Sequence, residues 1–379
     1  MQERQADIIE IASLDTFVLG ARVSQGPLSS LGVMPVRRAC LLRVRDADGA
    51  HGWGEIWCNF PPRGAESRAH LVADVIAPVL LGMRFSSWLE VRPSLEAALG
   101  RMAIHTGEAG AFAQCIAGID LAVADLAARR AMMSMTTFLG GGATTAQVYA
   151  STPSGGDLRE RCAGILDLGH RAIKLKIGYD ADADQSAVAA CREIVGPQFG
   201  LMVDANQAWD CEQAIARINS LARYEIDFVE EPLRADAPLD QWCRLAQAVR
   251  VPIAAGENIV GENAFAEVMT ARALRVVQPD VAKWGGVSGA LAVGRRANVL
   301  GLRCCMHFMG SGLGLAASLH VLAAIGGDGA VELDVNENPL RTELGPLDLA
   351  VRDGALPVPV GCGFGFDPDA AALRRLSLH

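Results

Sequence analysis

The sequence lacks several features that define whole classes of protein. Among its 379 residues, the longest apolar stretch, "GLGLAASLHVLAAIGG", contains His320 and falls short of the roughly 20 residues that a membrane-spanning helix needs. The net charge is -9, so there is no surplus of basic residues for binding nucleic acid or an anionic membrane. The first residues, "MQERQADIIE", are charged and lack the apolar region of a signal peptide. We therefore expect a cytoplasmic protein without a nucleic-acid or membrane partner.

Paired cysteines are lacking too. The ten cysteines are scattered along the chain, and no C-x-x-C pair occurs. This spacing disfavours a zinc site or a disulfide framework and is typical of reduced core residues. Apolar residues make up 51% of the chain, so it can bury a sizeable core, and its length suffices for a large barrel with an appended domain.

Eight short apolar runs alternate with amphipathic segments from about residue 145 onward. The runs are "AQVYAST", "AIKLKIG", "GLMVDAN", "DFVEEP", "VPIAAGEN", "RVVQPD", "RCCMHF" and "AVELDV". They recur at intervals of roughly 23–30 residues, and this alternation indicates a parallel α/β fold. Eight repeats favour a closed barrel over an open doubly wound sheet, so we predict a barrel over residues 141–345.

The segments before and after the predicted barrel lack this regular alternation of apolar runs and amphipathic segments. "ACLLRVRDADGAHGWGEI" indicates two strands joined by a turn at Asp48-Gly49, and "HLVADVIAPVLLG" and "GAFAQCIAGIDLAVADLAARRA" look helical. We therefore expect an α+β domain over residues 1–140. "LGGGATT" lacks the lysine of a phosphate-binding loop and is interpreted as a passage into the barrel. The Pro/Gly-rich segment 346–379 is expected to pack back on the first domain.

Two lysines interrupt one of the buried runs. In "AIKLKIG", Lys174 and Lys176 are two residues apart, so on a strand both ammonium groups point into one space. Burying two like charges side by side is costly. Carboxylates or a metal ion should therefore lie opposite this pair.

Polar groups follow the predicted strands at their carboxyl ends, which form a single ring in a barrel of this kind. In chain order they are Lys174 and Lys176, Asp204, Glu230, Glu257, Asp280, His307 and Glu332. Asp204, Glu230 and Glu257 are carboxylates from three adjacent strands, and an all-oxygen set suits Mg²⁺ or Mn²⁺. The alternative is that these acidic residues merely cap the helices that follow.

The ordered motifs resemble a known family. "GWGE", "KLK", "VDANQ", "VEEP", "GEN", "QPDVAKWGG" and the strand of His307 are similar to the mandelate racemase branch of the mandelate racemase/muconate lactonizing enzyme family, in the enolase superfamily. The resemblance covers essentially the whole chain. It implies a modified TIM barrel of the (β/α)7β type under an N-terminal α+β capping domain. It also implies one divalent cation, usually Mg²⁺, and a small-molecule carboxylate substrate. We expect a homo-oligomer.

The resemblance also implies a role for each ring residue. Asp204, Glu230 and Glu257 correspond to the metal ligands, Lys176 to one acid/base, and His307, oriented by Asp280, to the other on the opposite face of the substrate. Lys174 would neutralise the substrate carboxylate, Glu332 would hydrogen-bond to it, and Asn206 sits near metal and substrate. Lys283 is ambiguous, because the muconate-lactonizing branch uses a lysine on the sixth strand as its base. We interpret it as a secondary, substrate-contacting residue.

The chemistry of these residues supports the same roles. A proton next to a carboxylate is weakly acidic, and its removal creates an enediolate that a metal ion and a lysine stabilise; the general pattern of a Lys or His base with Mg²⁺ is known for enolase-type enzymes. We expect the two ammonium groups to depress each other's pKa, which would prepare Lys176 as a base. An Asp–His pair across adjacent strands fixes the tautomer of His307.

Two reactions remain open. The leading hypothesis is dehydration of a hydroxy acid, such as a sugar acid, to a 2-keto acid. The alternative is racemisation or epimerisation of a 2-substituted carboxylate. A non-enzymatic binding protein is disfavoured because the set of lysines, ligands and Asp–His pair is complete.

Substrate choice is expected to depend on two loops of the first domain, residues 20–36 and 55–64. Both are rich in apolar side chains, including Trp57 and Phe60, although these two could equally pack within the domain. Arg22, Ser29 and Arg63 are candidates for binding hydroxyl groups or a second carboxylate; each could instead be a solvated loop residue. "GSGLG", residues 310–314, is interpreted as a close-packed turn rather than a nucleotide loop.

Overall fold

The structure, a computed structural model, describes residues 8–24, 26–29, 32–151 and 157–378. Parts of four predicted segments lie outside these ranges. They are residues 1–7 of the N-terminal "MQERQADIIE", residues 25, 30 and 31 of the loop 20–36, Thr152 at the end of the first barrel run, and His379 at the end of the C-terminal segment.

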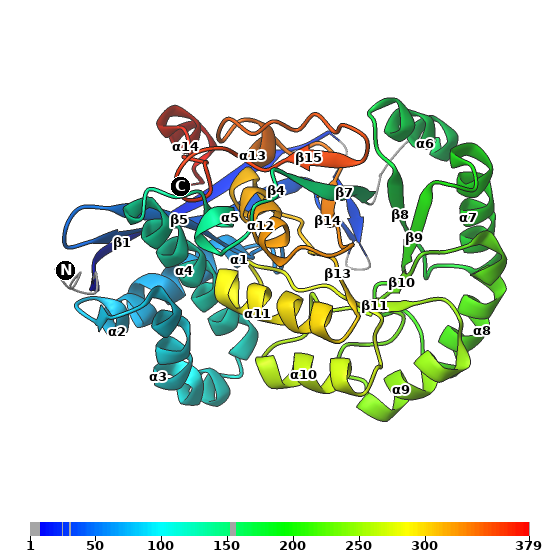
Figure 1. The fold of residues 1–379 in the computed structure, drawn as a ribbon, viewed down its shortest axis with the longest axis horizontal. Helices are drawn as coiled ribbons and strands as arrows, with labels where there is room; N and C mark the ends of the chain where they lie inside the picture. Colours follow the sequence, from blue (N-terminus) through cyan, green and yellow to red (C-terminus); the bar gives the residue numbers. More distant parts are fainter. Residues whose placement is uncertain (1–7, 25, 30–31, 152–156, 379) are drawn as a thin grey trace.

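The N-terminal part is an antiparallel sheet covered by helices (Figure 1). Its strands are β1 Ile9–Arg22, β4 Val36–Asp46, β5 His51–Ile56 and β6 Arg84–Phe85, in the order β5-β4-β1-β6, with a separate two-stranded sheet of β2 Leu28–Ser29 and β3 Gly32–Val33. The predicted hairpin turn is confirmed: β4 pairs with β5, and Gly49 in the connection has φ +86°.

The helices of this part include both predicted helical segments. They are α1 Gly64–Leu71, the π-helical turn η1 Val72–Ile76, α2 Ala77–Leu80, the 3-10 turn η2 Trp88–Glu90, α3 Val91–Thr106, α4 Ala109–Arg130 and α5 Met135–Phe138. Among the described residues, α4 is the one helix long and apolar enough to cross a membrane by length and composition, and 89% of the apolar window is buried in the protein, as in a core helix.

Two glycines of β5 explain how closely α4 approaches the sheet. A Cβ atom on Gly52 would lie 2.1 Å from the carbonyl oxygen of Ala122, and one on Gly54 would lie 2.0 Å from that of Gly118. Any larger residue would push helix and strand apart. The "GWG" of the sequence is therefore a packing requirement of this interface.

The second part is a parallel barrel, as the eight apolar runs predicted. Its strands are β7 Thr145–Ser151, β8 Ala172–Lys176, β9 Gly200–Asp204, β10 Val229–Glu230, β11 Ile253–Ala255, β12 Val276–Val277, β13 Arg303–Cys304 and β14 Val331–Asp334. They run in the order β13-β12-β11-β10-β9-β8-β7-β14. A parallel bridge between Met306 and Val331 joins the last pair, β13 and β14, and closes the barrel.

Helices connect successive barrel strands and cover their outer side (Figure 1). They are α6 Leu158–Asp167, α7 Ala181–Val195, α8 Cys211–Leu221 with the 3-10 turn η3 Ala222–Tyr224, α9 Leu239–Ala248, α10 Glu262–Thr270, α11 Gly286–Val299 and α12 Gly312–Ile325. Polar residues start several of them: the Asp180 side chain accepts two backbone N–H bonds of α7, and Asp210 forms a capping box with Gln213 at α8. Because β14 is followed by the short α13 Pro339–Thr342, the barrel is of the predicted (β/α)7β type.

Inside the barrel, a layer of apolar side chains lies beneath a layer of polar side chains at the carboxyl ends of the strands. The lower layer consists of buried residues from six strands or their ends: Tyr149, Met202, Phe228, Ala254, Val276 and Cys305. Two residues further along four of these strands, the same inner face carries polar groups at Asp204, Glu230, Gln278 and His307. The two-residue period of a strand thus places the polar ring directly above an apolar floor.

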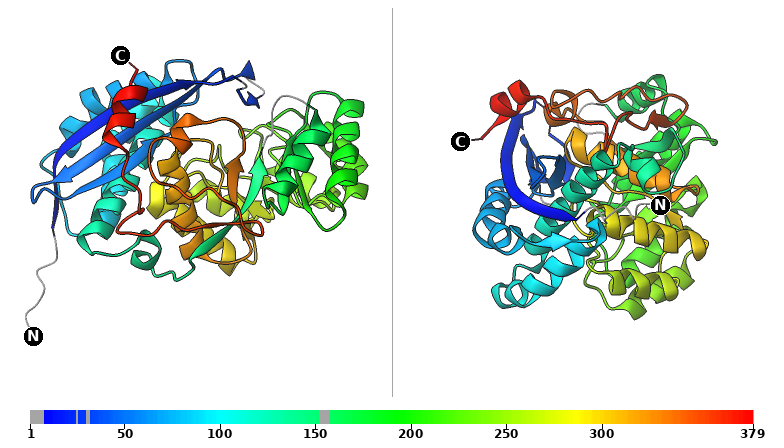
Figure 2. Two further views of the ribbon diagram at one scale, coloured as in Figure 1. Left: turned by 90° about the horizontal axis from the view of Figure 1, so that it is seen from above. Right: turned by 60° about the vertical axis from the view of Figure 1, so that its left-hand side comes forward.

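The C-terminal segment contacts both parts of the molecule. Its strand β15 Ala355–Pro357 pairs antiparallel with β7 of the barrel. Its helix α14 Ala370–Leu376 lies against β1, where the N–H of Leu378 donates to the carbonyl oxygen of Val18 at 2.9 Å (Figure 2). The domain boundaries at residues 140 and 345 stay predictions.

The interface between β5 and α4 generates the first test. Gly54→Ala should destabilise the protein by about 1–3 kcal/mol, because the new methyl group overlaps a backbone oxygen that cannot rotate away. Gly100→Ala in α3 is the matched control, since its Cβ meets nothing within 4 Å, and it should stabilise the helix by about 0.5–1 kcal/mol. Urea unfolding measures both, and equal stability of the two variants would contradict the packing argument.

Candidate active site

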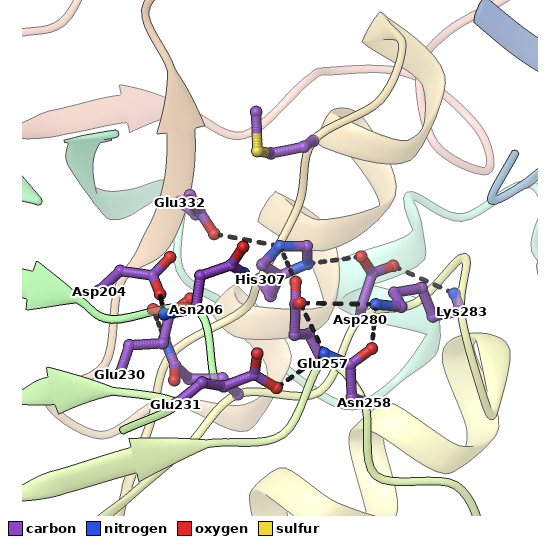
Figure 3. A network of polar contacts seen from close by, with 12 residues as sticks. Asp204, Asn206, Glu230, Glu231, Glu257, Asn258, Asp280, Lys283, His307 and Glu332 are labelled. Carbon is purple, nitrogen blue, oxygen red and sulfur yellow. Dashed lines mark hydrogen bonds and ion pairs between the residues drawn. The ribbon is translucent and has the colours of Figure 1, made fainter. Parts of the chain in front are cut away.

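The predicted ring residues come together at the carboxyl ends of the barrel strands. Figure 3 shows those other than the two lysines: Asp204, Glu230, Glu257, Asp280, His307 and Glu332. Lys174 and Lys176 lie on β8, Asp204 on β9, Glu230 on β10 and Glu332 on β14, whereas Glu257, Asp280 and His307 follow β11, β12 and β13. Strands β8 and β13 are separated by four strands in one direction around the barrel and by β7 and β14 in the other. Lys176 and His307 therefore project from opposite sides of the barrel mouth.

Lys174 is enclosed by carboxylates. Its Nζ lies 2.6 Å from Glu230 Oε2 and 2.8 Å from Glu332 Oε1, and it stands 5.5 Å from the centre of the Tyr149 ring in the layer below. Burial lowers the pKa of Lys174, but Glu230 and Glu332 together raise it well above its ordinary value. The side chain is a fixed positive charge at the base of the site.

Lys176 donates to Asp204 Oδ2 at 2.5 Å. Burial and Lys174 both lower the pKa of Lys176, yet the Asp204 carboxylate outweighs them and the pKa lies above its ordinary value. Lys174 thus depresses this pKa as expected, but the net pKa is raised, so the lysine pair alone does not prepare Lys176 as a base in this arrangement. The nearest opposite charge, and not the neighbouring like charge, decides that the pKa of Lys176 is raised.

His307 is held at both ring nitrogens. Its Nδ1 lies 2.6 Å from Asp280 Oδ2, and Asp280 is itself fixed by the backbone N–H of Ala282 at 2.7 Å. Its Nε2 faces Glu257 and lies 3.6 Å from Glu332 Oε2. Burial lowers the pKa of His307, but Glu257 and Glu332 raise it well above its ordinary value. Asp280 thus leaves Nε2 as the nitrogen that points into the site.

The three predicted metal ligands offer suitable donors. Asp204 and Glu230 are buried and Glu257 is half-buried, all as oxygen donors at adjacent strand ends. Burial, together with Asp204 and Glu332, raises the pKa of Glu230 to about 8, although Lys174 opposes the rise. A divalent cation would relieve this crowding of negative charge, so the residues fit Mg²⁺ or Mn²⁺.

These carboxylates are bonded to side chains of the protein itself. Lys176 holds Asp204, Lys174 holds Glu230, and His307 holds Glu257. Within the described ranges, no three His, Cys, Asp or Glu side chains converge at metal-ligand spacing. Binding of a cation therefore requires these carboxylates to rotate away from their present partners.

Sequence reasoning missed several residues that complete the site. Gln278 donates to Glu230 Oε2 at 2.5 Å, and the hydroxyl of Ser151 donates to Glu332. Gln278 Oε1 and Glu332 Oε2 are both buried and have no hydrogen-bond partner among the residues that the structure describes. The signal for Gln278 was present, since it stands two residues after Val276 on the inner face.

A second missed group connects four strand ends. Glu231, whose backbone has φ +40°, accepts from Asn258 Nδ2 at 2.8 Å and from Gln207 Nε2 at 3.2 Å. Asn258 also donates to Glu257 Oε1 at 2.8 Å and accepts from Lys283 Nζ at 2.7 Å (Figure 3). This chain of hydrogen bonds fixes the orientation of Glu257. The third letters of "VEEP" and "GEN", Glu231 and Asn258, were its signal.

Asn206 and Lys283 lie beside the ring, as predicted. The backbone N–H of Asn206 donates to Asp204 Oδ1 at 2.7 Å. Lys283 Nζ lies 3.6 Å from Glu257 Oε1 and 4.8 Å from the centre of the Trp57 ring. The backbone N–H of Trp57 also donates to the carbonyl oxygen of Ala282. Trp57 therefore contacts the barrel and does not pack only within the N-terminal part.

The other loop candidates have different positions. Arg22 and Arg63 are exposed, and the side chain of Ser29 lies outside the described residues. Ser24 joins the loop 20–36 to the barrel, because its N–H and hydroxyl donate to Glu337 Oε2 at 3.0 and 2.7 Å.

Glu55 of "GWGE" fastens the N-terminal part to the barrel. Its carboxylate accepts from Ser311 N–H at 2.8 Å, from the Ser311 hydroxyl at 2.6 Å and from Gly314 N–H at 2.9 Å. These donors form the start of α12, so the chain's own carboxylate occupies the end of the helix that would attract an anion. "GSGLG" is closely packed, as expected, but it is not a separate turn, because Gly312 to Gly314 form the start of α12.

Comparisons with known proteins agree with this geometry. Residues 14–140 match the mandelate racemase / muconate lactonizing enzyme N-terminal domain, and residues 157–372 match the enolase C-terminal domain-like family. A mandelate racemase/muconate lactonizing enzyme structure from Bordetella bronchiseptica RB50 is 43% identical with a TM-score of 0.91, covering 97% of this chain and 99% of that one.

Two further relatives differ from each other in activity. A racemase from Streptomyces coelicolor A3(2) with bound magnesium is 27% identical with a TM-score of 0.87, covering 97% of this chain and 100% of that one. The L-talarate/galactarate dehydratase of Salmonella typhimurium is 30% identical over 372 residues, or 96% of this chain and 87% of the relative.

The contact of Glu55 with α12 generates the second test. In the unmodified protein the Glu55 carboxylate accepts from backbone N–H groups; in Glu55→Gln an amide N–H group would face those same donors. The variant should therefore be less stable by about 1–3 kcal/mol. Glu66→Gln is the control, because Glu66 bonds the partly exposed Arg38 and its loss should cost less than about 1 kcal/mol. Denaturant titration compares the two, and similar losses would argue against the fastening role.

Proposed function

The chain belongs to the mandelate racemase/muconate lactonizing enzyme family of the enolase superfamily, and on that premise we propose that it dehydrates a small hydroxy acid, such as a sugar acid, to a 2-keto acid. The observation that carries the proposal is the two-sided acid/base set. Lys176 stands on one side of the barrel mouth and the His307–Asp280 pair on the other, with the buried positive charge of Lys174 between them.

Lys174 and Glu332 bind the substrate carboxylate in this proposal. The ammonium of Lys174 neutralises one carboxylate oxygen, while Glu332 hydrogen-bonds to the other through a proton shared between them. Asp204, Glu230 and Glu257 would hold a divalent cation, which would supply Lewis-acid stabilisation of the charge that develops there. Asp204 would then bond to Lys176 less strongly. Charge on the substrate is thus balanced where it forms.

Lys176 acts as the base that removes the α-proton. Only the neutral amine accepts a proton, so the bond from Lys176 to Asp204 must be released before the reaction. The Lys176 side chain is 15% exposed and stands beside Lys174. It can therefore reach the carbon next to a carboxylate that is bound to Lys174. Proton removal then gives an enediolate held by Lys174.

His307 acts from the other side as the acid. Asp280 holds Nδ1, which leaves the proton on Nε2 directed toward the substrate. Transfer of that proton to the departing β-hydroxyl releases water, and the resulting enol becomes the 2-keto acid. Asn206, Lys283 and the Trp57 ring beside it would contact the remainder of the substrate.

Racemisation or epimerisation of a 2-substituted carboxylate is the second candidate. The same two groups would exchange a proton with C2 from opposite faces. The similarity to a racemase and the apolar rings of Trp57 and Phe60, 6.4 Å apart beside the barrel, favour it. We also propose that the protein is a cytoplasmic homo-oligomer.

Metal dependence is the third test. Chelation of divalent cations should abolish turnover, and Mg²⁺ should restore it. Glu230→Gln removes one ligand charge with little change of shape and should weaken Mg²⁺ binding, measured by calorimetry, by roughly 10–100-fold or more. Glu160→Gln on the exposed side of α6 is the control and should bind Mg²⁺ normally. Full activity after verified metal removal would contradict the proposal.

The fourth test separates the two reactions. Lys176→Ala and His307→Asn should each lower turnover by on the order of 10²–10⁴, or about 3–5 kcal/mol of barrier. In a dehydratase, His307→Asn should stop formation of a keto acid trapped by semicarbazide, while Lys176 still exchanges the α-proton in D₂O. Inversion at C2 by the unmodified enzyme, with no keto acid at long times, would favour the racemase instead.

A further inference from the structure

We propose that Cys162 and Cys191 form an oxidative modification site, at which a small peroxide converts two buried thiols into a disulfide. The proposal rests on the geometry of the barrel wall and is independent of the proposed catalytic function. It also differs from the expectation drawn from the sequence, in which the cysteines were reduced core residues that form no disulfide.

The two sulfur atoms already touch. Cys162 lies on α6 and Cys191 on α7, which are neighbours on the outside of the barrel (Figure 1). Their Sγ atoms are 3.4 Å apart and share a hydrogen bond. A disulfide bond is about 2.05 Å long, so the sulfurs need to approach by only roughly 1.4 Å. A small rotation of the side chains supplies that distance.

This pair differs from the other cysteines. All ten cysteines are free thiols within the described residues, and no other pair there forms a sulfur–sulfur hydrogen bond. Cys304 and Cys305 are adjacent in sequence but point to opposite faces of a strand. Oxidation should therefore be selective for Cys162 and Cys191.

The surroundings determine which reagent can react. Both cysteines are fully buried, close to the apolar side chains of Ile165 and Val188 of the same two helices. The site thus admits a small neutral peroxide when the helices separate briefly and excludes a bulky oxidant. The hydrogen bond shared with Cys191 lowers the pKa of Cys162, with burial opposing it, which favours Cys162 as the attacking sulfur.

The chemical step balances with hydrogen peroxide as oxidant. The Cys162 thiolate attacks one peroxide oxygen and the O–O bond breaks, which gives a sulfenic acid and, after protonation, one water. Cys191 then attacks the sulfenic sulfur, the S–O bond breaks and the second water leaves. Two thiols are oxidised to one disulfide while both peroxide oxygens are reduced to water.

The new bond would enclose a functional strand. Strand β8, with Lys174 and Lys176, lies between α6 and α7 in the chain, so the loop closed by residues 162 and 191 contains it. Cross-linking constrains the unfolded chain. The oxidised protein should therefore resist heat better, with the helices on either side of β8 tied together.

The experiment treats the purified full-length protein with hydrogen peroxide. Peptide mapping after alkylation should show a Cys162–Cys191 link, and the free thiol count should fall from ten to eight. The thermal midpoint should rise by about 2–6 °C and return after dithiothreitol. Diamide, a bulkier oxidant, should react much more slowly.

Matched variants complete the design. Cys162→Ser and Cys191→Ser should each lose the link and the thermal shift, while Cys211→Ser, which alters a buried cysteine on α8, should keep both. Other disulfides without this link, sulfinic acid at Cys162, or a thermal shift that persists in Cys162→Ser would overturn the proposal. If a serine variant does not fold, the peptide map of the unmodified protein decides alone.

Discussion

The contact of Lys174 with Glu230 and Glu332 is the interaction on which the barrel mouth depends. The ammonium is 1% exposed and lies within 2.8 Å of both carboxylates, which come from β10 and β14 on either side of β8. Removing one member of such a buried group leaves an uncompensated charge, which is far more costly than exchanging all of them for apolar residues. The positions of three strand ends are thereby linked, and the remaining ring residues are arranged around them.

Much of this arrangement could be predicted because its signals are local. The eight apolar runs mark the strands, and residues that follow each run must meet at one end of a parallel barrel. The pKa of Lys176 could not be predicted, since it depends on a 2.5 Å distance to Asp204 on another strand. The contact of Cys162 with Cys191 depends likewise on how two helices pack. Strand β15 spans only Ala355–Pro357, too short to carry a pattern, so its pairing with β7 was not foreseen.

The N-terminal part meets the barrel through two residues close together in sequence. Glu55 binds the start of α12, and Trp57 lies beside Lys283 with its N–H on Ala282. The loops after β12 and β13 are therefore held by the same short segment of the cap. The polar ring residues stand at strand ends whose positions the barrel fixes. The loops around the ring can vary in sequence without disturbing it.

The apolar layer beneath the ring gives the site a direction. Tyr149, Met202 and Phe228 fill the barrel from wall to wall, and the edge of the Tyr149 ring packs against Phe228 at 6.1 Å. The polar ring is therefore closed off from below and faces the N-terminal part, where Trp57 lies beside Lys283. A molecule that reaches the ring and a molecule that leaves it must use this same side, so the departure of one has to precede the arrival of the next.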